Sequence, residues 1–145
     1  MTSPFRFSTP VKVRYNETDM QGHVNFGHYL FYFDAALVEY MDAIGYSYQD
    51  MLQDETDFLY VEGHCNYKSS AYWPEILNVH VRVGRVGDRS LRFEFETRAQ
   101  KDNRLVVTGH IAAVTARAKN FELCPVPERL RNAIRDYQGD LPQDG

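Results

Sequence analysis

The side chains best suited to chemistry gather between Arg14 and Gly45, a segment that reads RYNETDMQGHVNFGHYLFYFDAALVEYMDAIG. A polar turn containing Asp19, Gly22 and His23 leads into a long apolar stretch. Unpaired N–H groups and the dipole at a helix N-terminus favour negative charge. A carboxylate placed there suits an enzyme that stabilises an oxyanion while the carboxylate acts on the same substrate.

Asp19 is the first candidate for the reacting carboxylate. The alternation of apolar and charged residues from Val11 to Tyr15 predicts a strand, and its continuation would place Glu17 and Asp19 on one face. The alternative is that Asp19 is a solvated turn residue. The neighbouring glycine and the hydrogen-bonding side chains of His23 and Asn25 favour a functional role.

Other residues near this turn have alternative roles, and a metal site is a further alternative. His23 is either a hydrogen-bonded turn residue or a catalyst, and Asn25 is either a helix N-cap or a catalyst. Asp19 together with His23, His28 and His64 could suggest a metal site, but no HExxH or paired Cys/His spacing is present. GxSxG, Walker and GxGxxG motifs are also missing from the sequence, which therefore predicts no metal and no cofactor.

The elements that must position this turn follow from hydrophobic periodicity. A helix is expected over Phe26–Ile44, with Gly45 as its stop, followed by a polar stretch over Ser47–Thr56. Strands are expected at Phe58–Lys68, Leu77–Val86, Leu91–Ala99 and Leu105–Ala116, and a last helix is expected from Pro127. One long helix followed by four consecutive strands predicts an α+β fold, with an antiparallel sheet wrapped around the helix.

Length and composition indicate a single domain over residues 1–145, with a polar tail at about 138–145. The net charge of −4 argues against a nucleic-acid partner. Two isolated cysteines favour a reducing cytoplasm, and no apolar run long enough for a membrane span occurs. Aromatic residues make up 14% of the chain, which we attribute to the core or to an interface. We also expect apolar residues on the outer sheet face, and hence at least a dimer.

The segment at 14–45 resembles the hotdog-fold acyl-CoA thioesterases of the 4-hydroxybenzoyl-CoA thioesterase-like family. The family pattern of an Asp, a glycine-containing turn and a long helix is matched by Asp19, Gly22, Asn25, Tyr29 and Leu30. The segments VEGHCNYKSSAYWPEILNVHVRV and LCPVPERLRNAI extend the resemblance to about nine-tenths of the chain. The resemblance implies an acyl-CoA substrate, a homodimer with active sites at its interface, and further pairing into a homotetramer.

Carried over residue by residue, the resemblance implies that Asp19 attacks the thioester or activates water. The roles of His23 and Asn25 stay open, because GHVN leans towards a branch that includes acyl-carrier-protein thioesterases. Phe26 and Gly27 would supply the oxyanion N–H groups, and Tyr29 and His64 would contact the substrate. Coenzyme A phosphates would be bound by Arg89, Arg117 and Lys119. The alternatives are a carrier-protein thioesterase, a hotdog dehydratase and a non-catalytic acyl-binding protein.

Overall fold

The computed structural model of the protein describes residues 4–142. A short 3₁₀ turn, η1, spans Tyr15–Glu17. The other elements, in chain order, are β1 (Phe7–Lys12), α1 (His28–Ala43), α2 (Tyr48–Gln53), β2 (Thr56–Tyr67), β3 (Ile76–Val86), β4 (Ser90–Ala99), β5 (Leu105–Arg117) and α3 (Glu128–Gln138).

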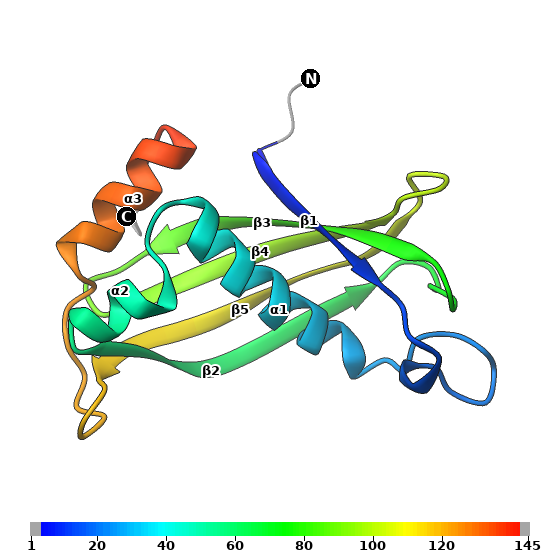
Figure 1. The fold of residues 1–145 in the computed structure, drawn as a ribbon, viewed down its shortest axis with the longest axis horizontal. Helices are drawn as coiled ribbons and strands as arrows, with labels where there is room; N and C mark the ends of the chain where they lie inside the picture. The colour runs from blue at the N-terminus through cyan, green and yellow to red at the C-terminus, as the bar shows by residue number, and fades with distance from the viewer. Residues whose placement is uncertain (1–3, 143–145) are drawn as a thin grey trace.

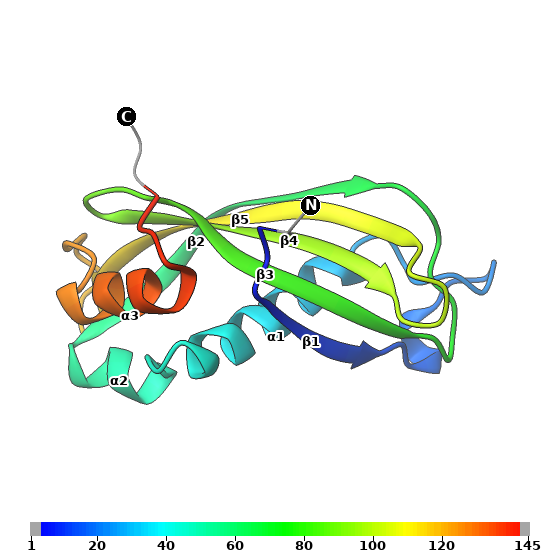
Figure 2. The same ribbon diagram turned by 90° about the horizontal axis from the view of Figure 1, so that it is seen from above.

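The five strands form one antiparallel sheet in the order β1-β3-β4-β5-β2. Helix α1 runs along the concave face of this sheet, and α2 and α3 lie at one end of it (Figure 1). Seen from above, the sheet curves over α1 (Figure 2). The predicted α+β arrangement, with an antiparallel sheet around one long helix, is confirmed.

The core lies between α1 and the concave face of the sheet. Residues of β3 and β4 alternate between buried and half-buried, as expected for strands with one covered face. Phe33 of α1 stacks on Phe95 of β4, with ring centroids 4.4 Å apart. Leu30 of α1 is partly exposed, and its side chain lies against Gly63 of the edge strand β2.

The outer face of the sheet is polar, and the expectation of large apolar residues on this face was wrong. Arg82 pairs with Glu94 at 2.8 Å and Arg98 pairs with Glu96 at 3.1 Å. The large apolar residues of β3 and β4 point inwards, so alternation accounts for both faces of these strands. Exposed apolar side chains gather instead on α1 and on β2, where Phe31, Val38, Tyr60 and Val61 are exposed.

Two local predictions are corrected by the structure. The strand at the N-terminus ends at Lys12, and η1 follows it, so Glu17 and Asp19 do not share a strand face. The stretch after α1 contains a helix, α2, where only a polar connection was expected. Ser47 accepts a hydrogen bond from the Asp50 N–H, and the Asp50 carboxylate accepts one from the Ser47 N–H, which is a capping box. The remaining predicted strands and helices agree with the structure to within a few residues.

The chain ends add little to the fold. The predicted polar tail begins at the last residue of α3, and the Val86 N–H donates to the Pro142 carbonyl. Residues 143–145 of that tail lie outside the described residues. None of the helices between residues 4 and 142 has the length and hydropathy needed to cross a membrane.

The connection between β2 and β3 brings a loop to the turn that carries Asp19. These strands follow each other in sequence, but β4 and β5 lie between them in the sheet. Residues 68–75 must therefore cross the end of the sheet, close to the turn that joins β4 to β5. This crossing segment is the wall against which the Asp19 turn packs.

Close packing of β5 against β2 predicts a marked difference between two glycines. A Cβ at Gly109 would lie 2.1 Å from the His64 carbonyl oxygen and 2.7 Å from Phe33. Gly109→Ala should therefore lower the free energy of unfolding in urea by about 2–3 kcal/mol, because backbone must move to admit the methyl group. The control is Gly63→Ala, whose Cβ would meet only the mobile end of Leu30 at 3.0 Å and should cost less than about 1 kcal/mol. Equal losses in the two variants would contradict this packing.

Candidate active site

The turn that carries Asp19 is held by its own backbone. The Asp19 N–H donates to the His23 carbonyl at 2.8 Å, and the Gly22 N–H donates to the Asp19 carbonyl at 3.0 Å. Gly22 has a φ of +85°, which glycine adopts without strain. One carboxylate oxygen of Asp19 accepts the Gln21 N–H at 2.9 Å, and the side chain is otherwise exposed. The carboxylate is therefore oriented by the turn without being used up by it.

The segment 68–75 holds this turn from the other side. The Val24 N–H donates to the Ala71 carbonyl at 2.9 Å, and His23 forms an isolated β-bridge with Tyr72. The rings of His23 and Tyr72 meet edge to face, with centroids 5.4 Å apart. His23 is thus a half-buried residue at the contact between two loops.

Asn25 organises the entry into α1. Its backbone carbonyl accepts the His28 N–H at 2.9 Å, and its side-chain oxygen accepts the Gly27 N–H at 3.1 Å. The residue that directly precedes α1 is Gly27. Asn25 therefore satisfies N–H groups at the helix start from two residues further back than an N-cap would. The Gly27 N–H, one of the two predicted oxyanion donors, is engaged by Asn25 in this structure.

A pocket of about 340 Å³ lies between the turn, the start of α1 and the crossing segment. Four predicted site residues line it together: Asp19, His23, Phe26 and Tyr29. The other lining residues are Val24, Tyr67, Lys68, Ser69 and Ser70. The residues after Tyr67 were not predicted as site residues, because only the strand order reveals that the end of β2 returns to the Asp19 turn.

Tyr29 and Tyr67 shape the apolar side of this pocket. Burial raises the pKa of Tyr29 to about 12, and a hydrogen bond with the Ala71 backbone opposes part of that shift. The phenol therefore stays neutral at physiological pH and does not act as a base. The Tyr67 hydroxyl donates to the Phe26 carbonyl at 2.9 Å, which ties the end of β2 to the start of α1.

Glu17, the other carboxylate considered near the turn, is occupied elsewhere. It accepts hydrogen bonds at 2.8 Å from the Arg14 N–H and from the Tyr32 hydroxyl. Burial and the bond to Glu17 together raise the pKa of Tyr32. Asp19 is thus the carboxylate that faces the pocket.

Residues 13–134 of the chain match the thioesterase-like superfamily. The chain belongs to this superfamily. It is a thioester hydrolase, as the resemblance of the 14–45 segment implied. The match includes the whole pocket and all elements except β1 and the last part of α3.

Known relatives of this thioesterase agree with its fold. The acyl-CoA thioesterase YbgC of Haemophilus influenzae is 30% identical over 89 residues, which cover 61% of this chain and 65% of the relative. The solved DHNA-CoA thioesterase of Staphylococcus aureus superposes with a TM-score of 0.81 at 23% identity, covering 95% and 97% of the two chains. A 1,4-dihydroxy-2-naphthoyl-CoA thioesterase of Synechocystis gives 0.80 at 18% identity, covering 90% and 96%. The predicted hotdog fold is confirmed.

Other predicted site residues of the thioesterase lie away from the pocket. His64 is on the polar outer face of the sheet, where its ring stacks on His110 at 5.1 Å and Glu62 contacts His110. Arg89 lies between β3 and β4, and Arg117 and Lys119 lie at and beyond the end of β5. Arg117 pairs with Thr56, at the opposite end of β2 from Tyr67. Eleven strand steps separate these ends by roughly 36 Å.

No group of three or more His, Cys, Asp or Glu side chains is placed to hold a metal ion within residues 4–142. The two cysteines of the thioesterase, Cys65 and Cys124, are not joined to each other.

The contact between Asn25 and Gly27 separates the two roles considered for Asn25. Asn25→Ala removes the acceptor of the Gly27 N–H and should lower the free energy of unfolding by about 1 kcal/mol. Asn25→Asp keeps an acceptor oxygen and should unfold within about 0.5 kcal/mol of the wild type. Urea unfolding followed by circular dichroism measures both. If Asn25→Ala unfolds like the wild type yet loses activity, the side chain itself takes part in chemistry and a purely capping role is wrong.

Proposed function

We propose that this thioesterase hydrolyses an acyl-CoA to the free acid and coenzyme A, with Asp19 as the reacting carboxylate. The observation that carries the proposal is that Asp19 shares one pocket with the first residues of α1. Relatives named for CoA thioesters, such as YbgC and the DHNA-CoA thioesterase, support coenzyme A as the thiol.

Two routes fit a carboxylate at this position. In the first, an Asp19 oxygen attacks the thioester carbon, the C–S bond breaks, and the thiolate leaves with the electron pair. Water then cleaves the resulting anhydride and restores the carboxylate. In the second, Asp19 takes a proton from water as the water attacks the carbonyl carbon. The tetrahedral intermediate then collapses, the C–S bond breaks, the thiolate leaves with the electron pair, and the proton on Asp19 passes to the thiolate and restores the carboxylate. Coenzyme A thiolate is a good leaving group, so neither route requires a strong general acid.

The oxyanion that forms in either route needs N–H donors at the start of α1. None of the described residues accepts the Phe26 N–H, so this group is available to the substrate. The Gly27 N–H becomes available only when the side chain of Asn25 releases it. We therefore assign the main donor role to Phe26, supported by the helix dipole. We assign a structural role to His23, which lines the pocket and holds the turn, and we assign proton transfer to Asp19.

A second copy of the chain would complete the site. β2 is a twelve-residue edge strand, and exposed apolar side chains flank it on α1. Two-fold pairing of β2 with the partner's β2 is antiparallel, so the Thr56 end of one strand lies beside the Tyr67 end of the other. This arrangement would carry the cations near Arg117 towards the pocket of the opposite protomer, where the phosphates of coenzyme A need them.

Further pairing of such dimers into a tetramer, and a location in the cytoplasm, complete the proposal. The free thiols of Cys65 and Cys124 suit a reducing compartment.

Replacing the reacting carboxylate tests the proposal. Asp19→Asn preserves the size of the side chain and its bond to the Gln21 N–H, but it removes the charge that attacks or accepts a proton. We expect kcat/KM to fall by at least about 100-fold, with unchanged circular dichroism and oligomeric state. Thiol release from short, long and aromatic acyl-CoAs measures the loss.

The matched control is Asp136→Asn, an exposed carboxylate of α3 that does not line the pocket. This variant should retain wild-type rates. Wild-type protein that releases no thiol from any member of the panel would contradict acyl-CoA hydrolysis. Full activity in Asp19→Asn would move the chemistry to another residue of the pocket.

A further inference from the structure

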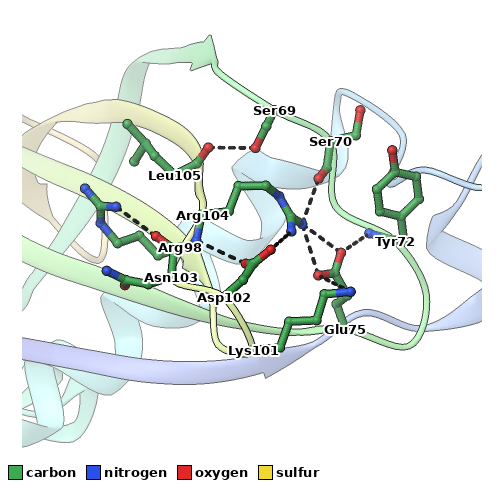
Figure 3. Close-up of polar contacts among 10 residues, drawn as sticks. All are labelled: Ser69, Ser70, Tyr72, Glu75, Arg98, Lys101, Asp102, Asn103, Arg104 and Leu105. Carbon is green, nitrogen blue, oxygen red and sulfur yellow. Dashed lines mark hydrogen bonds and ion pairs between the residues drawn. The ribbon is translucent and has the colours of Figure 1, made fainter.

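A buried ion pair joins the β4–β5 turn to the segment that crosses the end of the sheet (Figure 3). The side chain of Glu75 is only 6% exposed, and its two oxygens accept hydrogen bonds from Nη2 of Arg104 at 2.9 and 3.0 Å. Lys101 adds a longer contact of 3.6 Å. A carboxylate buried to this degree is stable only when it is paired and hydrogen-bonded, so Arg104 and Glu75 hold each other in place.

The same guanidinium reaches two further groups. Nη2 donates to the Ser70 carbonyl at 3.0 Å, and Nη1 donates to Asp102 at 2.7 Å (Figure 3). Arg104 thus connects the β4–β5 turn to both Ser70 and Glu75. The planar fork of donors makes this possible, and a lysine ammonium could not reproduce its geometry.

These contacts fix the wall of the pocket. Ser70 lines the pocket directly, and its neighbour Ser69 donates through its hydroxyl to the Leu105 carbonyl at 2.7 Å. The N–H groups of Lys68 and Ser69 both donate to the Val106 carbonyl, at 2.9 and 3.1 Å. The first residues of β5 and the side chain of Arg104 therefore hold the backbone of the wall together.

The crossing segment also holds the turn that carries Asp19. Ala71, which directly follows Ser70, accepts the Val24 N–H. Glu75 accepts the Tyr72 N–H at 2.8 Å, and the Tyr72 ring contacts His23. A continuous path of hydrogen bonds and contacts thus leads from Arg104 through residues 70–75 to the turn that carries Asp19.

We propose that Arg104 is a positioning residue for thioester hydrolysis. It touches no substrate and acts through residues 70–75, whose position sets the orientation of the Asp19 turn and of the Ser70 side of the pocket. The inference rests on the proposed function, because it takes Asp19 to be the reacting carboxylate.

The test compares two arginines of the same hairpin. Arg104→Met removes the side-chain hydrogen bonds to Ser70, Glu75 and Asp102, while the backbone N–H at position 104 still donates to Asp102. The control Arg98→Met removes an arginine that binds Glu96 and the Asn103 carbonyl but makes no hydrogen bond or ion pair to the crossing segment. We expect kcat of Arg104→Met to fall about 10-fold to 100-fold with KM changed less than about 3-fold, and Arg98→Met to match the wild type.

A second variant separates positioning from simple loss of stability. Arg104→Met leaves a buried carboxylate with a weaker partner, so its melting temperature should fall. The double variant Arg104→Met/Glu75→Gln removes that charge and should recover most of the melting temperature, while kcat stays low because Ser70 is still unanchored. Recovery of kcat together with the melting temperature would overturn the positioning role.

Hydrogen exchange provides a readout that does not depend on activity. The Val24 amide should exchange faster in Arg104→Met and in the double variant than in the wild type and in Arg98→Met. Unchanged Val24 exchange in Arg104→Met would overturn the inference, whatever the activity of this variant. The two proposals can also fail separately. If the wild type is inactive on every acyl-CoA while Val24 exchanges faster in Arg104→Met, only the proposed function is contradicted, because the link from Arg104 to the Asp19 turn is still shown.

Discussion

The strand order of the sheet is the constraint on which the site depends. With β4 and β5 placed between β2 and β3, the chain must cross the open end of the sheet before β3 begins. The crossing segment supplies the Ala71 carbonyl that holds Val24 and the serines that line the pocket. A simple meander of neighbouring strands would leave the Asp19 turn with nothing to pack against at this edge.

At the start of α1, different side chains satisfy different backbone groups beside the pocket. Asn25 accepts two N–H groups of the helix start, the Tyr67 hydroxyl donates to the Phe26 carbonyl, and the Phe26 N–H has no acceptor among the described residues. The Asp19 carboxylate is oriented by one bond to the Gln21 N–H and keeps its remaining acceptor capacity. The Asp19 carboxylate and the positive end of the α1 dipole therefore lie at the same pocket, an arrangement that suits attack on a thioester carbonyl.

Much of this arrangement could be predicted from the sequence, because it depends on local patterns. Alternation in β3 and β4, the apolar face of α1 and the glycine of the turn each have a direct physical signature. The other side of the pocket and its supports could not be predicted in the same way. Lys68 and Ser70 reach the pocket only through the strand order, and the Arg104–Glu75 pair joins residues 29 positions apart. The expectation of large apolar residues on the outer face was wrong, because strict alternation in β3 and β4 turns their large apolar residues inwards.

The central claim is that the thioester lies between Asp19 and the start of α1. It is tested most directly by a crystal structure of the Asp19→Asn variant with an uncleaved acyl-CoA bound. The account predicts the thioester carbonyl oxygen about 3 Å from the Phe26 N–H, with the side chain at position 19 facing the carbonyl carbon. A thioester bound on the outer sheet face beside His64 and His110, or bound with its carbonyl turned away from α1, would contradict it.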